Sequence, residues 1–250
     1  MGYALSIGQS PRQVARIGLA VLSGQLAIGW QNDWTDAGRD RLVGRADKPV
    51  VSGEVPAHLV GAAALTAGAL CLPASLANGR RAGLIHLLAV LSAASYNAGL
   101  KATPASFAPY ALSFSLLPVF AQRAGVAGRR APWWAPAAAG SLGVAAHLLN
   151  VLPDREQDRE LGIYGLPQRL NPETDLALAG GLLALSSLLI TTGGGRADPL
   201  ALGGLAASLG LGAALLLVAR QRADRSPFRL VLVLALLDVA QLLLAAHRSR

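Results

Sequence analysis

The sequence predicts an all-α fold, a polytopic membrane bundle of about eight transmembrane helices that form one domain over residues 1–250. Apolar residues make up 53% of the chain, charged residues only 14%, and the mean hydropathy is +0.44. This composition is too apolar for an ordinary soluble domain. Strand periodicity is weak, and Leu, Ala and Gly dominate, so we expect helices and not a β-barrel.

The predicted spans are apolar runs of roughly 17 to 23 residues, the length needed to cross the hydrocarbon core of a bilayer. The first is interpreted as a retained span and not as a signal peptide, because no small-residue cleavage site follows it. Pro56, the Asn78-Gly79 turn and Pro104 mark boundaries between later spans. The runs lie at residues 14–30, 55–77, 82–100, 106–121, 132–152, 176–192, 200–219 and 228–246.

An acidic stripe follows the first run. Asp33, Asp36 and Asp40 are spaced i, i+3 and i+7, so on a helix they project from one face and crowd their charges. Such crowding becomes favourable when divalent cations lie among the carboxylates, and Mg²⁺ is usually held by a few carboxylates, waters and phosphate oxygens. Arg45 and Lys48 are suitable phosphate partners. The alternative is a solvated, mixed-charge loop between two helices.

A second stripe makes the loop explanation weaker. Asn150, Asp154 and Asp158 are spaced i, i+4 and i+8, and they again follow an apolar run. With eight spans, both stripes and Lys101 fall on the same side of the membrane. Lys48 and Lys101 are the chain's lysines, and both stand near these acids. Two acidic stripes led by asparagine at membrane boundaries therefore predict one shared site.

These motifs resemble those of the UbiA-type intramembrane prenyltransferases, over about residues 30 to 170. The family pattern N-D-x-x-D-x-x-x-D is matched by Asn32, Asp33, Asp36 and Asp40, and D-x-x-x-D by Asp154 and Asp158. The trailing elements are matched by Arg45, Lys48 and Pro49 after the first motif, and by Gly162, Leu166 and Pro167 after the second. A Tyr before a Lys appears as Tyr96 and Lys101, one residue further apart than usual.

The resemblance implies helices around a central cavity that is open to lipid. The family usually has nine helices, two of them before the first motif. Only one is visible here, so either the true start lies upstream or this branch has lost a helix. The implied activity is Mg²⁺-dependent transfer of a prenyl group from a prenyl diphosphate to an electron-rich acceptor, aromatic or a quinone precursor. Quinone, porphyrin and lipid-sugar acceptors all stay open.

Roles for individual residues also follow from the resemblance. The implied metal ligands are Asp33, Asp36, Asp40, Asp154 and Asp158. The implied diphosphate contacts are Asn32, Arg45, Lys48, Tyr96 and Lys101. Asn150, Asp154 and Asp158 would orient the acceptor or take its proton. If the stripes share one diphosphate, the side chains of Asp36 and Asp158 should lie within about 10 Å of each other.

Other classes were weighed against this one. A net charge of +8 raises the possibility of nucleic-acid binding, but the arginines are scattered over short loops, so no nucleic-acid partner is expected. A CDP-alcohol phosphotransferase is disfavoured because its D-G-x-x-A-R signature is missing. A transporter lined by acids, or a non-catalytic prenyl-lipid-binding family member, stays open.

The resemblance also implies an integral protein of the cell membrane with the motif face in the cytoplasm, although lysine and arginine are divided too evenly to orient the chain by themselves. His147 precedes Asn150 by one helical turn, where it could contact an acceptor or hydrogen-bond a neighbour. Asp238 is an acid within the last span, which suggests a function or an interhelical partner. We place neither residue in the core site.

Overall fold

The computed structural model describes residues 1–42, 44, 48–125, 130–193, 199, 202–210, 236 and 239–245. All regular structure within these residues is helical, which confirms the all-α prediction. The long helices are α2 (Pro11–Leu42), α4 (Ala57–Leu76), α5 (Arg80–Asn97), α6 (Phe107–Arg123), α7 (Trp134–Val151) and α10 (Pro172–Gly193). The short ones are α1 (Gly2–Ser6), α3 (Pro49–Ser52), η1 (Leu100–Ala102), η2 (Leu152–Asp154), α8 (Arg155–Glu160) and α9 (Leu166–Arg169).

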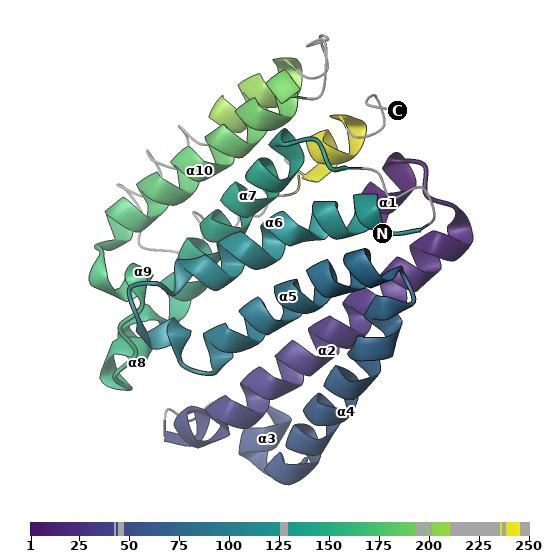
Figure 1. Ribbon diagram of the computed structural model, residues 1–250. Helices are drawn as coiled ribbons and strands as arrows, with labels where there is room; N and C mark the ends of the chain where they lie inside the picture. Colours follow the sequence, from purple (N-terminus) through teal and green to yellow (C-terminus); the bar gives the residue numbers. More distant parts are fainter. Residues whose placement is uncertain are drawn as a thin grey trace.

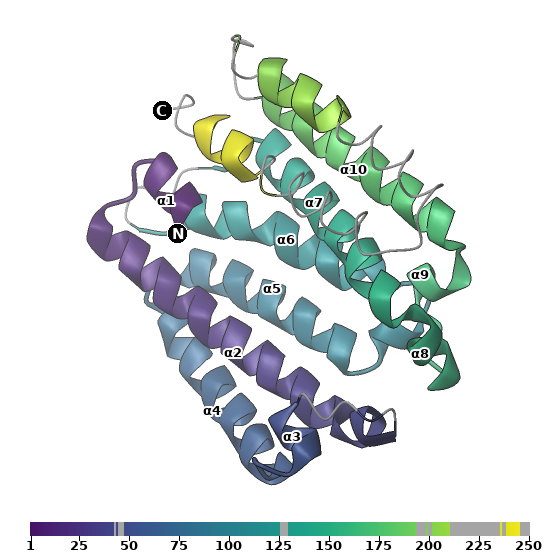
Figure 2. The ribbon, with the colours of Figure 1, turned by 180° about the vertical axis from the view of Figure 1, so that it is seen from behind.

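The long helices lie side by side in a bundle (Figures 1 and 2). Neighbouring pairs are α4 with α2, α2 with α5, α5 with α6, α6 with α7, and α7 with α10. The short helices α3, α8 and α9 lie at one end of the bundle, and α1 lies at the other (Figure 1). The segments that carry the two acidic stripes and Lys101 therefore meet at one end, as the order of the spans requires.

Six of the predicted spans coincide with the long helices, and the last two lie largely outside the described residues. The first differs from its prediction, because α2 continues through the acidic stripe to Leu42 instead of ending near Trp30. The intervening residues contain no proline to interrupt the helical hydrogen bonds.

By length and composition, three helices of the described part suffice to cross a membrane: Ala57–Leu76, Trp134–Glu160 and Pro172–Gly193. The others, α2, α5 and α6, are shorter or more polar, and each borders the cavity described below.

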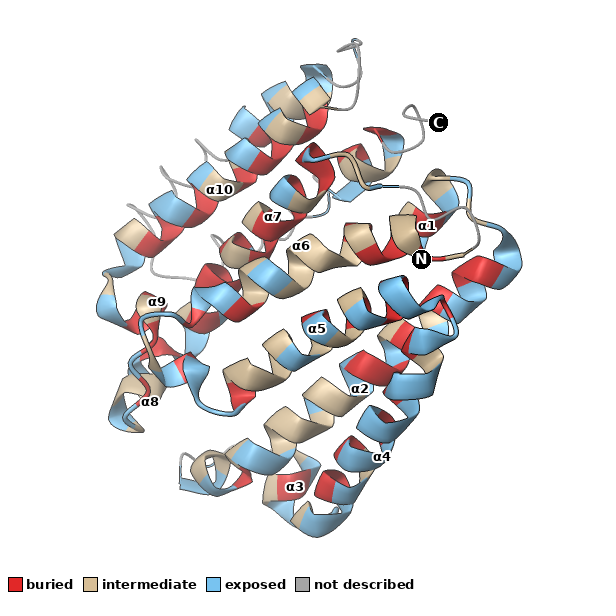
Figure 3. Ribbon diagram, in the orientation of Figure 1, coloured by how far each residue is buried: buried red, intermediate tan, exposed pale blue. Residues whose placement is uncertain are grey.

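Many residues along the helices are exposed, as the pale blue ribbon segments of Figure 3 show, and large apolar residues are among them. Leu22 on α2, Leu65 on α4, Leu91 on α5 and Leu188 on α10 are all exposed. Exposed apolar surface of this extent is unfavourable in water but expected against lipid tails. The helix faces therefore agree with an integral membrane protein.

Small residues let neighbouring helices approach closely. A Cβ atom added to Gly143 of α7 would lie 2.6 Å from the carbonyl oxygen of Tyr110 on α6. One added to Gly61 of α4 would lie 2.8 Å from the ring of Trp34 on α2. Close approach through glycine is a common way to pack helices in membranes, and here it lets α7 pack closely on α6 and α4 on α2.

Candidate active site

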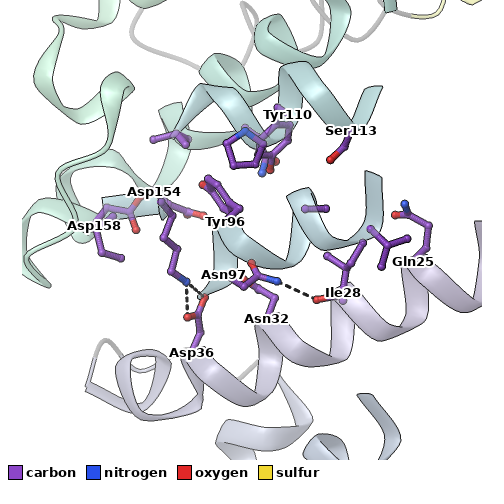
Figure 4. A pocket seen from close by; sticks show the side chains of 18 of the residues that line it. Gln25, Ile28, Asn32, Asp36, Tyr96, Asn97, Tyr110, Ser113, Asp154 and Asp158 are labelled. Atoms are coloured by element: carbon purple, nitrogen blue, oxygen red, sulfur yellow. Dashed lines mark hydrogen bonds and ion pairs between the residues drawn. The ribbon is translucent and has the colours of Figure 1, made fainter. Parts of the chain in front are cut away.

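A cavity of about 460 Å³ lies between α2, α5, α6 and the segment from α7 to α8. Both acidic stripes line it. Asn32, Asp36 and Asp40 come from α2, while Asn150, Asp154 and Asp158 come from the end of α7, η2 and α8. Figure 4 shows Asp36 on one side of the cavity, and Asp154 and Asp158 on another. The two stripes thus border one space, which is what a shared ligand requires.

The residues of α2 that line the cavity differ at one position from the predicted acidic face. Asn32, Asp36 and Asp40 line it, whereas Asp33 does not. The Asp33 side chain is 40% exposed and its Oδ1 lies 3.2 Å from Nζ of Lys48. Since residues four apart share a helical face, the lining residues of the first stripe have the Asn-x-x-x-Asp-x-x-x-Asp spacing of the second.

Cationic side chains neutralise the first stripe. Nζ of Lys101 lies 2.5 and 2.7 Å from the two carboxylate oxygens of Asp36, which also pairs with Arg39. Nζ of Lys48 lies 2.8 Å from Oδ2 of Asp40. Every carboxylate of this stripe, Asp33 included, therefore has a lysine or arginine partner.

The two lysines differ in their electrostatics. Burial lowers the pKa of Lys101 below its ordinary value, and its bonds to Asp36 only partly offset this effect. Burial also acts to lower the pKa of Lys48, but hydrogen bonds and charge attraction from Asp40 and Asp33 outweigh it, so that the pKa is raised. Lys101 is thus the more desolvated cation, so an anionic ligand would gain more binding free energy from Lys101 than from Lys48.

The longer spacing between Tyr96 and Lys101 is accommodated in a tight turn. Helix α5 ends at Asn97, Gly99 follows with a φ of +138°, and η1 then carries Lys101. A positive φ of this kind favours glycine. Both Tyr96 and Lys101 still line the cavity.

Contacts with α9 and α10 hold the second stripe in position. Oδ2 of Asp158 accepts a hydrogen bond of 2.7 Å from Nε2 of Gln168. Next to it, Arg155 forms a 2.7 Å ion pair with Asp175 at the start of α10, and both side chains are almost fully buried. A buried ion pair holds its partners in one geometry, because separating them would leave an uncompensated charge.

The α8–α9 connection also packs against the segment that carries Lys101. The backbone N–H of Leu166 donates to Oγ of Ser106 at 2.9 Å. A Cβ atom on Gly165 would lie 2.5 Å from the carbonyl oxygen of Lys101, so a larger residue would push the two segments apart. The second stripe and Lys101 are therefore positioned together.

Comparison with known proteins identifies the family. The sequence model described as "UbiA prenyltransferase family" matches residues 1–237. The chain belongs to the UbiA prenyltransferase family. The resemblance stated from the motifs is confirmed. A search of curated proteins found no match.

Solved structures of UbiA homologues have the same fold. One, the structure without ligand of a homologue from Aeropyrum pernix K1, is 21% identical to this chain and has a TM-score of 0.77. The match covers 97% of this chain and 94% of the homologue. Another, from Archaeoglobus fulgidus bound to DMAPP and Mg²⁺, is 18% identical with 98% and 93% coverage and a TM-score of 0.73. A digeranylgeranylglyceryl phosphate synthase is 19% identical with 98% and 89% coverage and a TM-score of 0.69.

Several lining residues of this UbiA-family chain were missed by the motifs. Arg39 lies within the first motif, at a position the pattern leaves open, and Asn97 directly follows Tyr96. Nδ2 of Asn97 donates to the carbonyl oxygen of Ile28 at 3.1 Å and so links α5 to α2 (Figure 4). Gln25 and His86 lie far from any motif, and only the fold brings them to the cavity.

Other predicted positions lie outside the cavity or outside the described residues. His147 is buried, with its Nε2 2.9 Å from Oγ of Ser106 and its ring stacked on Tyr110. It hydrogen-bonds a neighbour and does not line the cavity. Arg45 and Asp238 lie outside the described residues.

The carboxylates of this UbiA-family site suit a metal ion only when a further ligand completes its coordination. Among the described residues, no three His, Cys, Asp or Glu side chains converge on one point as a protein cage for a metal would require. Mg²⁺ rarely uses such a cage and is more often held by one or two carboxylates together with waters and substrate phosphates. Carboxylates on two sides of one cavity suit that arrangement.

Proposed function

We propose that this chain transfers a prenyl group from a prenyl diphosphate to an electron-rich acceptor, aromatic or a quinone precursor, within the membrane and with Mg²⁺. The observation that carries the proposal is that two Asn-led acidic stripes line one cavity, with the buried Lys101 bound to one of them. Family membership and the DMAPP and Mg²⁺ bound by the A. fulgidus homologue support this donor and this metal.

In this proposal the first stripe and its cations bind the donor. Lys101, Lys48 and Arg39 line the cavity and present positive charge to a diphosphate, and Asn32 and Tyr96 line it beside them. Arg45 is proposed for the same role from its motif alone. Asp36, Asp40, Asp154 and Asp158 would hold Mg²⁺, with Asp33 at the edge of the site. Bound Mg²⁺ supplies charge neutralisation for the leaving diphosphate.

The second stripe acts on the acceptor. The allylic C–O bond of the donor breaks with its electron pair leaving on diphosphate, a bond forms from the acceptor to the prenyl carbon, and the acceptor loses a proton. Asp154, Asp158 and Asn150 line the cavity, and we propose that they orient the acceptor and receive that proton. Gln168 and the Arg155–Asp175 pair hold this stripe in position.

The same proposal places the protein in the cell membrane with the acidic end in the cytoplasm. The apolar outer faces of α4 and α10 support a membrane location. The meeting of both stripes at one end of the bundle supports a single polar face.

Transfer of label from donor to product tests the function. Membranes containing the protein are incubated with Mg²⁺ and labelled prenyl diphosphates of several chain lengths, and products are identified by mass spectrometry, with an Asp36→Ala membrane preparation as control. A labelled product that depends on Asp36 is expected. Prenyl diphosphate binding without any product, under conditions where a UbiA homologue is active, would favour the non-catalytic lipid binder. Absence of both binding and product would favour a transporter.

A further inference from the structure

The end of the cavity away from the acidic stripes also carries polar side chains. Gln25 on α2 and His86 on α5 both line the cavity, and neither belongs to a motif. In Figure 4, Gln25 lies at the end away from Asp36, Asp154 and Asp158. At a rise of about 1.5 Å per residue, Gln25 is about 16 Å from Asp36 along α2, and His86 is about 15 Å from Tyr96 along α5.

The two side chains lie at the same depth. The His86 ring lies against α2 at the level of Gly24, the residue before Gln25, since a Cβ atom on Gly24 would lie 3.4 Å from Cε1 of that ring. Two helices thus each contribute a polar side chain at one level of the cavity. Polar residues inside membrane spans are costly and usually have a function.

The hydrogen bonds of His86 define what it can offer. Oγ of Ser75 donates to the carbonyl oxygen of Cys71 at 2.6 Å, which uses its single hydrogen. Its 2.8 Å contact with Nδ1 of His86 therefore has Nδ1–H as the donor. The proton is then on Nδ1, and Nε2 is the ring nitrogen with a free lone pair, on a side chain that lines the cavity. Stacking on Phe120, with ring centroids 4.6 Å apart, fixes the ring.

Gln25 complements this acceptor. Its side-chain amide makes no hydrogen bond to any residue that the structure describes, and it can both donate and accept. A prenyl tail over these groups would remove them from water without offering a hydrogen bond, which is unfavourable. A ligand with a hydroxyl group at this depth would satisfy both.

We infer that the inner end of the cavity, formed by His86 and Gln25, is a hydrogen-bonding subsite for the far end of the acceptor. This inference rests on the proposed function. It assigns the acceptor to a class: an elongated molecule whose reacting carbon lies at the acidic end and whose other end carries a hydroxyl group. A purely hydrocarbon far end is disfavoured.

A matched pair of probes tests the subsite. 4,4′-Dihydroxybiphenyl and 4-hydroxy-4′-methylbiphenyl share one phenol ring and differ only in a hydroxyl or methyl group at the far end. Their affinities for the full chain in lipid nanodiscs are measured by calorimetry. The dihydroxy probe should bind at least about tenfold more tightly, because an unmatched buried acceptor is costly.

Variants assign this preference to the subsite. His86→Phe keeps an aromatic ring for the stack on Phe120 but removes both ring nitrogens, Nε2 and the Nδ1 that contacts Ser75. Gln25→Leu removes the amide from a side chain that is not packed in the core. Each variant should bring the affinity ratio towards one. His58→Phe is the same change at an exposed position of α4 outside the cavity and should keep the wild-type ratio. A wild-type ratio near one, or a ratio that survives in both His86→Phe and Gln25→Leu, overturns the inference.

The donor site is read out separately on the same samples. Mg²⁺-dependent binding of geranyl diphosphate reports on the acidic end and not on the inner end. Its absence in the wild-type protein would overturn the proposed function, whereas a missing hydroxyl preference with intact donor binding would overturn the subsite alone.

Discussion

The two acidic stripes have the same spacing but different partners. In the first stripe the carboxylates contact cations: Asp36 pairs with Lys101 and Arg39, and Asp40 pairs with Lys48. In the second, Asp158 accepts its hydrogen bond from the neutral amide of Gln168. Cations that pair with carboxylates can exchange them for diphosphate oxygens, whereas a hydrogen bond donated by a neutral amide orients a carboxylate without neutralising its charge. The cations of the first stripe are therefore suited to capture an anion, whereas Asp158 of the second stripe is held in one orientation by a neutral group.

The largest effect should come from the first stripe. Asp36→Asn should reduce prenyl transfer by at least about a hundredfold, because Asp36 would hold the Mg²⁺ that neutralises the leaving diphosphate, and losing such electrostatic stabilisation usually costs about that much. The motifs alone predict equal losses at Asp33 and Asp36, but the structure separates them. Asp33→Asn removes an acid outside the cavity lining, in a partly exposed pair, and should cost no more than about fivefold.

Initial rates of labelled-product formation measure both variants, with unfolding curves as the control for folding. Equal and complete loss in Asp33→Asn and Asp36→Asn would show that the lining face does not define the site. Full activity in both would remove the first stripe from the mechanism.

Loss of the ion pair that holds the second stripe in position should lower the stability of the protein. Asp175→Ala leaves Arg155 buried without its partner and should destabilise the protein by about 3–5 kcal/mol. The double variant Asp175→Ala with Arg155→Met should recover much of that loss, since apolar replacement of a buried pair is often neutral. Unfolding in detergent measures both. If Asp175→Ala alone were as stable as the wild-type protein, the contact with α10 would not hold the second stripe in position.

Lys101 should dominate donor affinity. Lys101→Ala should weaken binding of a prenyl diphosphate by about ten- to a hundredfold, the cost of one charge-assisted hydrogen bond. Lys48→Ala should cost less, because the Lys48 side chain is 22% exposed and that of Lys101 only 6%. Equilibrium binding of geranyl diphosphate compares the two. If a folded Lys101→Ala protein bound geranyl diphosphate with unchanged affinity, Lys101 would pair with Asp36 without contacting the donor.

A modest effect should come from Gln168. Gln168→Leu removes the donor to Asp158 but leaves the backbone carbonyl that binds Arg159. Losing such a supporting contact should weaken the apparent Mg²⁺ affinity by roughly tenfold. A Mg²⁺ titration of transfer activity measures this effect, and an unchanged titration would show that the orientation of Asp158 does not depend on the amide.

Much of the fold could be predicted because membranes impose simple rules on sequence. Apolar length alone located α4, α7 and α10. The end of α2 was placed too early, because a run of charged residues looks like the end of a span even when it is the helical wall of a polar site.

The site was predictable where the motif itself carries the chemistry, as with Asp36, Asp154 and Lys101. Choosing Asn32 over Asp33 as a lining residue required knowing which side of α2 faces α5. The pairing of Arg155 with Asp175, twenty residues apart in sequence, and the presence of both Gln25 and His86 in the cavity lining depend on helix packing. Long-range contacts of this kind leave no local pattern.

The length of α2 has a consequence for how the protein would meet its substrates. Its 32 residues span about 48 Å, against a hydrocarbon core of about 30 Å. One rigid helix thus carries a wall of the cavity within the bilayer and the acidic stripe towards headgroup depth. A lipid-borne donor would arrive by lateral diffusion in the plane of the membrane, so its effective concentration is a mole fraction of lipid. Diluting such a donor with inert lipid at constant total amount would slow the reaction, although nothing in the aqueous phase had changed.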